Sequence, residues 1–248
     1  MAFPTVAATT GGNFTTGTSY TLNLPSGVVD RSLVIMAITI NADGGAPTLP
    51  AGWNSIFSVF SNNAATTLFY RHCTGSEGAS ISVSNFGAVN AKAVYQAKRI
   101  AGHHLAQAVE GSGAAGNTAN PNPPSSTPSW GALDTLFIAG VGYTNDGRTV
   151  SSYPTNYISN QVDQAGDGTS NGCHVAIATR EVNGVSEDPG TFTLSGASVE
   201  VAFTLAIRPA LPLADYTASQ TLDDVTQTAT LTFTAAMSAS HTLDDVTQ

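Results

Sequence analysis

The sequence predicts an all-β fold, a jelly-roll-like β-sandwich made of two internally duplicated halves and followed by a short tail of β-repeats. Three observations carry this prediction. Apolar residues recur with the two-residue period of strands, a long segment repeats, and the composition changes near residue 210. Helical periodicity is weak, and Gly, Pro, Asn and Asp interrupt the apolar runs at short intervals, which is typical of turns between strands.

Individual strands follow from alternation and run length. Apolar and polar side chains alternate most clearly at residues 20–24, 79–84, 191–194 and 199–207. Residues 33–40 form an apolar run that is short enough for one strand buried on both faces. Residues 91–100 resemble a helix in composition, but Ala93 and Tyr95 alternate with Val94 and Gln96. We therefore predict a strand there as well.

A long segment of the first half recurs in the second. The phrase SGVVDRSLVIMAITINADGG…LPAGW returns as WGALDTLFIAGVGYTNDGR…YPTNY, which matches Trp53 with Tyr157. We predict two copies of a five- or six-strand motif, residues 18–101 and 124–209, joined by an extended Gly/Pro/Asn/Ser-rich connection at 111–129. Neither copy can easily close a core alone, so we expect the copies to face each other as one sandwich. Two separate immunoglobulin-sized sandwiches are the alternative.

The tail, residues 211–248, differs in kind from the sandwich at residues 1–210. It contains five Asp and no Lys or Arg, and its phrase ASQTLDDVTQ returns as ASHTLDDVTQ. The alternating Thr and apolar residues between these copies give one apolar face in a segment too short to bury it. We expect another copy or the sandwich itself to complete the tail, through these apolar residues: Leu222, Val225, Leu231, Phe233, Leu243 and Val246.

The charge balance excludes several kinds of partner. Only 10% of residues are charged, and 17 acidic against 8 basic residues give a formal net charge of −9. The basic residues are scattered, so we expect neither nucleic acid nor an anionic membrane surface as a partner. The N-terminus lacks the pattern of a secretory signal, so we expect a soluble protein made in a cytosol. A surface covered mainly by Ser, Thr, Asn, Gln and Gly suits contact with other proteins or with neutral glycans.

Motifs for catalysis or cofactor binding are absent from the sequence. There is no Gly-x-Ser-x-Gly elbow, P-loop or dinucleotide fingerprint, so we expect neither an enzyme nor a cofactor. His103–His104 is a possible metal pair, but no Cys or carboxylate follows at zinc spacing, so we expect solvent-exposed polar histidines. We expect Cys73 and Cys173 to be buried free thiols rather than a disulfide, because a cytosol is reducing.

Two acidic segments have weak functional signals. Residues 163–171 offer oxygen atoms to Ca²⁺ but lack the regular Asp spacing of a calcium loop, so we predict a flexible turn. Glu187–Asp188 has the residue types of glycosidase carboxylates, although consecutive acids fit turn initiation better.

Four aromatic residues are candidates for stacking on sugars: Trp53, Trp130, Tyr153 and Tyr157. Trp53 follows Pro-Ala-Gly and Trp130 precedes Gly131, so both are expected at junctions between strands and turns. Packing in the corners of the core is the more common role of an aromatic ring at such a junction. Both interpretations stay open at this point.

A set of phrases covers nearly all of residues 1–210: MAFPTVAAT, LPAGW, EGASISVS, NPPSSTPSWGALDTLFIAGVGY, YPTNY and SEDPGTFTLSGASVEVAFTLAIRP. With these phrases the chain resembles a family of small virion-associated proteins of tailed bacteriophages. The tail is similar to the TLDDVT repeats appended to capsid-associated and tail-associated phage proteins. The resemblance implies a virion component with a β-sandwich fold, and it brings no catalytic motif.

We therefore expect a bacteriophage structural protein, synthesised in the host bacterial cytoplasm and located in the virion. A capsid decoration or cement protein fits best, with the major capsid protein or a tail protein and other copies of itself as partners. The alternative is a head- or tail-borne adhesin that binds host surface glycan through exposed aromatic residues. A glycan-active enzyme on a jelly-roll scaffold is the least favoured hypothesis.

Overall fold

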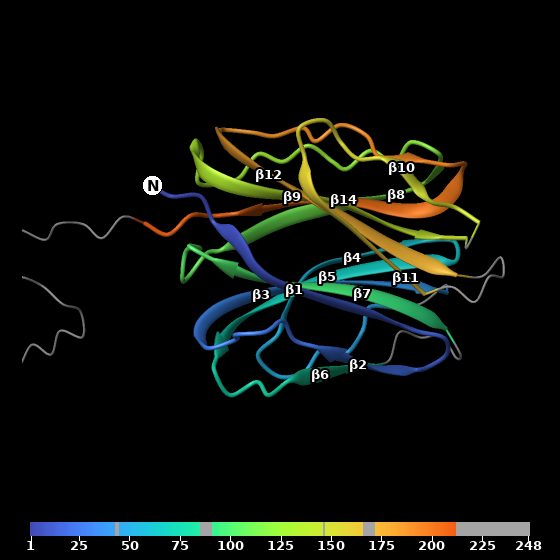
Figure 1. Cartoon of the computed structure of the whole chain (residues 1–248), viewed down its shortest axis with the longest axis horizontal. Helices are drawn as coiled ribbons and strands as arrows, with labels where there is room; N and C mark the ends of the chain where they lie inside the picture. Colours follow the sequence, from blue (N-terminus) through green and yellow to red (C-terminus); the bar gives the residue numbers. More distant parts are fainter. Residues whose placement is uncertain (43–44, 85–90, 146, 166–171, 212–248) are drawn as a thin grey trace, which may run out of the picture. The chain divides into compact units, whose positions relative to one another are not determined.

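The protein is described from a computed structural model, which covers residues 1–42, 45–84, 91–145, 147–165 and 172–211, with only the backbone given for 159–165. Within these ranges the chain forms strands and no helix, which confirms the predicted all-β class (Figure 1). The segment at 163–171, predicted as a flexible turn, falls partly outside the described residues, and the tail with its six apolar residues falls outside them from residue 212 onward.

Two five-stranded antiparallel sheets make up most of the structure. The first has the order β1 (Thr5–Phe14), β7 (Lys92–Ala101), β3 (Asp30–Asn41), β5 (Ala64–Thr74) and β4 (Asn54–Ser61). The second has the order β11 (Ile158–Ala165), β12 (Cys173–Gly184), β9 (Leu133–Thr144), β14 (Ser198–Ile207) and β8 (Val109–Thr118). Two small sheets complete the described fold: β2 (Ser19–Asn23) with β6 (Ser80–Ser84), and β10 (Val150–Ser152) with β13 (Thr193–Leu194).

The two large sheets share one topology. The first sheet, read from β1, has the order β1-β7-β3-β5-β4, and the second, read from β8, has the order β8-β14-β9-β12-β11. Strands in the same place of the two orders correspond, which is the arrangement that a duplicated chain would give. Contacts between the sheets are also reciprocal. Strand β4 contacts β8 while its counterpart β11 contacts β1, and β5 contacts β14 while its counterpart β12 contacts β7. Such reciprocity is the property of a two-fold interface, so the halves pack as two copies in a symmetric dimer do.

Strand β3 explains how one apolar run serves two cores. Its side chains alternate between a central core, which lies between the sheets and receives Leu33 and Ile35, and a first outer core, which receives Val34 and Met36. Since the side chains of a strand point alternately to opposite faces, a strand with apolar residues at every position can be buried on both. The prediction of a doubly buried strand at residues 33–40 is confirmed.

Each half also closes a core of its own, contrary to the sequence-based expectation. The first outer core lies under β2 and β6, and the second outer core, which includes Phe137 and Val141 of β9, contains Phe192 and Leu194 from the segment around β13. A few apolar side chains on a two-stranded layer suffice to cover the outer face of each large sheet. The structure therefore combines both alternatives, two small sandwiches packed back to back around a shared central core (Figure 1).

Polar contacts fix the two sheets against each other. The Gln96 side chain of β7 donates a hydrogen bond from Nε2 to the Val175 carbonyl oxygen of β12, at 3.2 Å. Within the first sheet, the buried hydroxyls of Thr39 and Thr66 bond to each other at 2.9 Å. Buried polar groups that are hydrogen-bonded in this way favour one alignment of the sheets over others.

The connection predicted at residues 111–129 requires correction, because its first part lies in edge strand β8. Strand β8 has the sequence VEGSGAAGNT, in which Gly and Ala replace the alternating large residues that signal a strand. The small residues have a packing reason. A Cβ atom on Gly113 would lie 2.7 Å from the ring of Phe57, so glycine allows β4 of the first half to approach β8. The structural halves thus begin with β1 and β8, earlier than the predicted repeats at 18–101 and 124–209.

Candidate functional site

The four aromatic candidates all pack into outer cores. Trp53 is 7% exposed and meets Phe69 edge to face, with ring centroids 5.5 Å apart. Tyr157 is 6% exposed, and the half-buried rings of Trp130 and Tyr153 pack against the second outer core. The structure does not bring these four residues together into one site, because Trp53 belongs to the first half and the other three belong to the second half. Burial of Trp53 and Tyr157 leaves little ring face for a sugar, which favours corner packing over stacking.

The same turn places Trp53 and Tyr157 in equivalent corners. Trp53 N donates to the Pro50 carbonyl oxygen and Tyr157 N to the Pro154 carbonyl oxygen, both at 3.2 Å. In each turn the preceding residue has a positive φ, which is 83° at Gly52 and 67° at Asn156. This left-handed residue reverses the chain and directs the following ring into the core.

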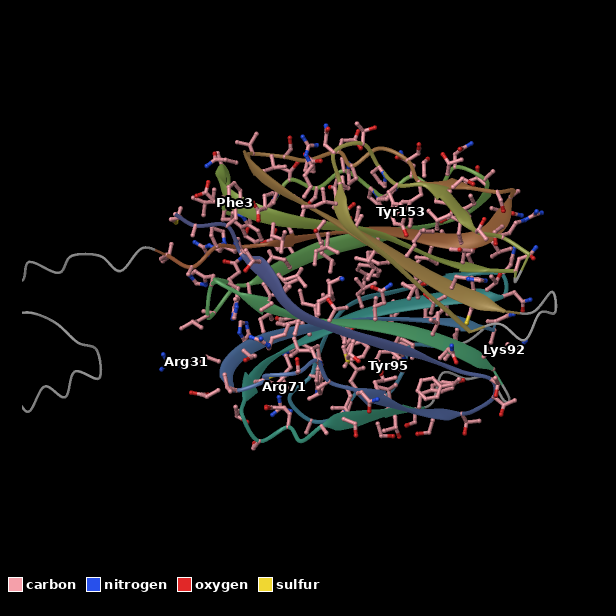
Figure 2. All side chains as sticks on the ribbon, viewed as in Figure 1. Phe3, Arg31, Arg71, Lys92, Tyr95 and Tyr153 are labelled. Atoms are coloured by element: carbon pink, nitrogen blue, oxygen red, sulfur yellow. The ribbon has the colours of Figure 1, made fainter. Side chains whose placement is uncertain are left out.

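An arginine–glutamate pair lies beside each corner. Arg71 Nε is 3.0 Å from Glu77 Oε1 in the first half, and Arg180 Nη1 is 2.7 Å from Glu187 Oε1 in the second. Figure 2 shows Arg71 in the first half. Tyr157 also donates to Glu187 Oε1, at 3.3 Å. Glu187, considered above as a glycosidase acid, is thus a buried partner of Arg180 in the structure.

A hollow of about 360 Å³ opens beside the first corner and is lined by Trp53, Arg71, Glu77 and several serines, among them Ser82. Glu77 accepts hydrogen bonds from Thr74 and from Gly75 N as well as pairing with Arg71. Burial raises the pKa of Glu77, but the bonds from Thr74 and the charge of Arg71 outweigh it, so this pKa lies below its ordinary value. A carboxylate with its oxygens so occupied suits binding better than proton transfer.

His103 differs from the expectation of an exposed side chain, because it is 7% exposed. Its backbone pairs with Pro209, its Nδ1 lies 3.1 Å from the Ile100 carbonyl oxygen, and its ring centroid lies 5.4 Å from that of His72. Burial, helped by the neighbouring His72, lowers the pKa of His103 to about 4. His104 instead accepts hydrogen bonds from Ala106 N and Gln107 N, so the two histidines do not converge.

Metal ligands and paired thiols are not found among the described side chains. No three His, Cys, Asp or Glu residues gather there as ligands for an ion. Cys73 and Cys173 are buried free thiols, as predicted, and lie in the first outer core and the central core respectively. Burial raises the pKa of Cys73 to about 11, which makes its thiol a poor nucleophile.

The edge strands β1 and β8 are the most distinctive surface elements. Each has ten residues and is bonded to a single strand of its own sheet, while an edge strand of the other sheet approaches it, β11 in the case of β1 and β4 in the case of β8. Strand β1 carries no charged residue, and β8 carries only Glu110. Natural sheets commonly protect their edges with charges or Pro. Large apolar side chains are also exposed, including Val29, Leu105 and Leu211.

The comparisons with known proteins add no relative. No protein-family model, no curated protein and no solved structure matches this chain. Among the described residues, no helix has the length and hydropathy to cross a membrane. The resemblance to phage virion proteins therefore stays an expectation, which rests on the phrases quoted for it.

Proposed function

We propose that the chain is a structural protein of a tailed-bacteriophage virion, which decorates or cements the capsid through protein–protein interfaces. The observation that carries the proposal is the pair of nearly uncharged edge strands. Strand β8 runs against β14 for ten residues without a register shift, so its backbone donors and acceptors are evenly spaced, and on the side where β4 approaches, Ser61 Oγ of β4 donates to the Gly116 carbonyl oxygen at 3.2 Å. A strand from a neighbouring subunit can pair with such an edge.

The mechanism is reinforcement of the shell by interface area, without chemistry. Strand addition supplies main-chain hydrogen bonds, and exposed apolar groups such as Val29 and Leu105 add buried area when subunits meet. The low charge supports this role, because charged groups are costly to desolvate in an interface. The neighbour would be the major capsid protein, a tail protein or another copy.

The first experiment replaces Ala114 and Ala115, both exposed on β8, with lysine and measures how much protein binds to particles that lack it. We expect at least a tenfold loss of occupancy with unchanged melting temperature, since charges on an edge prevent strand pairing. Ser186→Lys, at an exposed loop position, is the matched control and should bind as wild type. Full occupancy by the double variant would contradict the proposal.

Two further measurements test the virion role. A stained gel of purified particles should show hundreds of copies per virion, whereas a few dozen or fewer would favour an adhesin. Deletion of residues 213–248 should leave the sandwich folded and weaken assembly. If the truncated protein coats particles at full strength, the role expected for the tail is wrong.

The second candidate function, an adhesin for neutral host glycan, is favoured by the hollow beside Trp53. Arg71 and serine hydroxyls there offer the hydrogen-bonding groups that sugars use. A glycan array should then show binding that is lost in Ser82→Tyr, which obstructs the hollow, and kept in Ser151→Tyr, an exposed serine of the other half. Absence of binding to any glycan by wild-type protein would end this alternative.

A further inference from the structure

A row of three polar residues crosses the outer face of the second sheet. Register places Glu200 of β14 opposite Tyr143 of β9, and Tyr143 opposite His174 of β12. The Tyr143 and His174 rings are stacked, with centroids 4.6 Å apart and planes 4° from parallel. All three are buried, with exposures of 3% for Glu200, 0% for Tyr143 and 1% for His174.

The equivalent row of the first half is apolar. There Ala93 of β7 lies opposite Ile40 of β3, and Ile40 lies opposite Ala65 of β5. These strands have the same places in their sheet as β14, β9 and β12, so the rows correspond position by position. Because the apolar row fills the same place in the same topology, the fold does not require a carboxyl group there.

The Glu200 carboxyl lacks the partners that an ionised group needs. Its Oε2 atom and the Tyr143 hydroxyl are both buried without a hydrogen-bond partner. An ionised carboxylate in this position would be strongly disfavoured, because burying an unpaired charge costs far more free energy than burying a neutral carboxyl group. Glycine at position 116 makes room for this side chain, which lies against the backbone of β8.

The Ala202 backbone N–H is the one described group found to favour the ionised form of Glu200. Strand β8 contributes Gly116 beside the carboxyl, β9 contributes Tyr143, and β12 contributes His174. Tyr153, shown in Figure 2, acts on Tyr143, and Arg148 is directed to the Ala197 carbonyl oxygen, to which its Nε donates at 3.2 Å. Burial raises the pKa of Glu200 to about 7, the Ala202 backbone N–H opposes this in part, and no described charged side chain is among the causes.

We propose that the second half contains a buried proton-binding site, centred on the Glu200 carboxyl beside Tyr143, that couples proton uptake to closure of the layer over the second outer core. That layer consists of β10, β13 and the segment at 119–121, which receives hydrogen bonds from Phe192 N and Leu194 N. Protonated Glu200 is compatible with the closed layer. Ionised Glu200 favours opening, because water can then reach the charge.

The size of the coupling follows from the two protonation equilibria. In the closed layer the pKa of Glu200 is about 7, and in the open layer it returns to the ordinary value of 4.5. By linkage, the opening equilibrium should increase by about 70-fold between pH 5 and pH 8. Global stability of the wild type does not isolate Glu200, because His103, with its pKa lowered to about 4, changes stability in the opposite direction.

Hydrogen exchange of single amides, corrected for intrinsic exchange rates, tests the site. The probes are the backbone amides of Phe192 and Leu194, which donate hydrogen bonds to the Pro121 and Ala119 carbonyl oxygens in the layer over the second outer core. Their protection should decrease by about 70-fold from pH 5 to pH 8 in the wild type and stay at the pH 5 level in Glu200→Gln. The backbone amide of Leu24, which donates to the Ala79 carbonyl oxygen beside the first outer core, is the internal control, and its protection should not change with pH.

Two outcomes of the exchange experiment would overturn the proposal. One is constant protection of Phe192 and Leu194 in the wild type, and the other is a pH dependence that persists in Glu200→Gln. A direct titration of wild-type protein decides the matter if the variant does not fold. The δ-carbon resonance of Glu200, assigned through its backbone, should titrate near pH 7, and a midpoint near 4.5 would also refute the site.

Discussion

Replacing Gly140 with alanine tests how the central core is packed. Gly140 of β9 lies opposite Phe203 of β14, whose ring covers it and reaches Phe57 of the first half, with centroids 6.3 Å apart. A Cβ atom on Gly140 would have three atoms of the Phe203 ring no farther than 2.8 Å away. Carbon atoms in contact prefer about 3.5–4.0 Å, so the ring must shift toward Phe57.

The expected cost follows from this overlap. Overpacking a core costs about 1–3 kcal/mol, and the lower backbone freedom of alanine in the unfolded chain returns about 0.5–1 kcal/mol. Because the overlap with the Phe203 ring is severe, we take the upper end of both ranges and expect Gly140→Ala to lower the free energy of unfolding by about 2 kcal/mol. For a unit of this size, that corresponds to a fall in melting temperature of roughly 4–8 °C.

Urea unfolding followed by tryptophan fluorescence measures the effect. Gly184→Ala in β12 is the matched control, because its Cβ would meet Val182 at 3.4 Å, an ordinary contact, and it should stay within about 0.5 kcal/mol of wild type. In a Phe203→Leu background the cost of Gly140→Ala should decrease by about 1 kcal/mol. The reasoning is refuted if Gly140→Ala behaves like the control, or if the smaller residue at 203 gives no relief.

Three further predictions concern buried polar groups. Gln96→Leu removes the hydrogen bond to the Val175 carbonyl oxygen and should lower the free energy of unfolding by about 1 kcal/mol, as measured by urea unfolding. An unchanged urea midpoint would contradict a stabilising role for this bond. Because burial raises the pKa of Cys73 to about 11, its native thiol should react with Ellman's reagent at pH 8 far more slowly than in urea, and equal rates would disprove burial. The pKa of His103 is lowered to about 4, so its contribution to the free energy of unfolding is complete above pH 6.5 and decreases by up to about 3 kcal/mol as the pH falls to 4. The pKa of Glu200 is raised to about 7, so its contribution is complete below pH 4.5 and decreases by a similar amount as the pH rises to 7. Glu200→Gln should therefore show a decline of stability toward pH 4 that is absent from His103→Gln, as followed by thermal melts, and identical profiles would contradict both shifts.

The sequence was sufficient to predict much of the fold. Apolar residues at every position of residues 33–40 indicated a doubly buried strand, and β3 has its side chains in two cores. Alternation at residues 91–100 correctly excluded a helix, because β7 occupies Lys92–Ala101. These predictions depend on the period of side chains along a strand, which is local information.

Other features depend on contacts that the sequence does not display. Strand β8 was missed because its glycines are explained by side chains from distant parts of the chain: Gly111 faces Leu205, Gly113 faces Phe57 and Gly116 faces Glu200. The burial of His103 depends on pairing with Pro209, far along the chain. The row containing Glu200 becomes visible only when the register aligns three strands, since a single glutamate in an alternating strand is usually a solvent-facing residue.

The reciprocal packing of the halves has a consequence for how such a chain can diversify. In a dimer of identical subunits every substitution appears twice, so a residue tolerated at one site must be tolerated at its mate. A covalently joined pair escapes that constraint. Glu200 could arise where its counterpart stayed Ala93, so that one lobe remains a plain scaffold while the other is free to specialise.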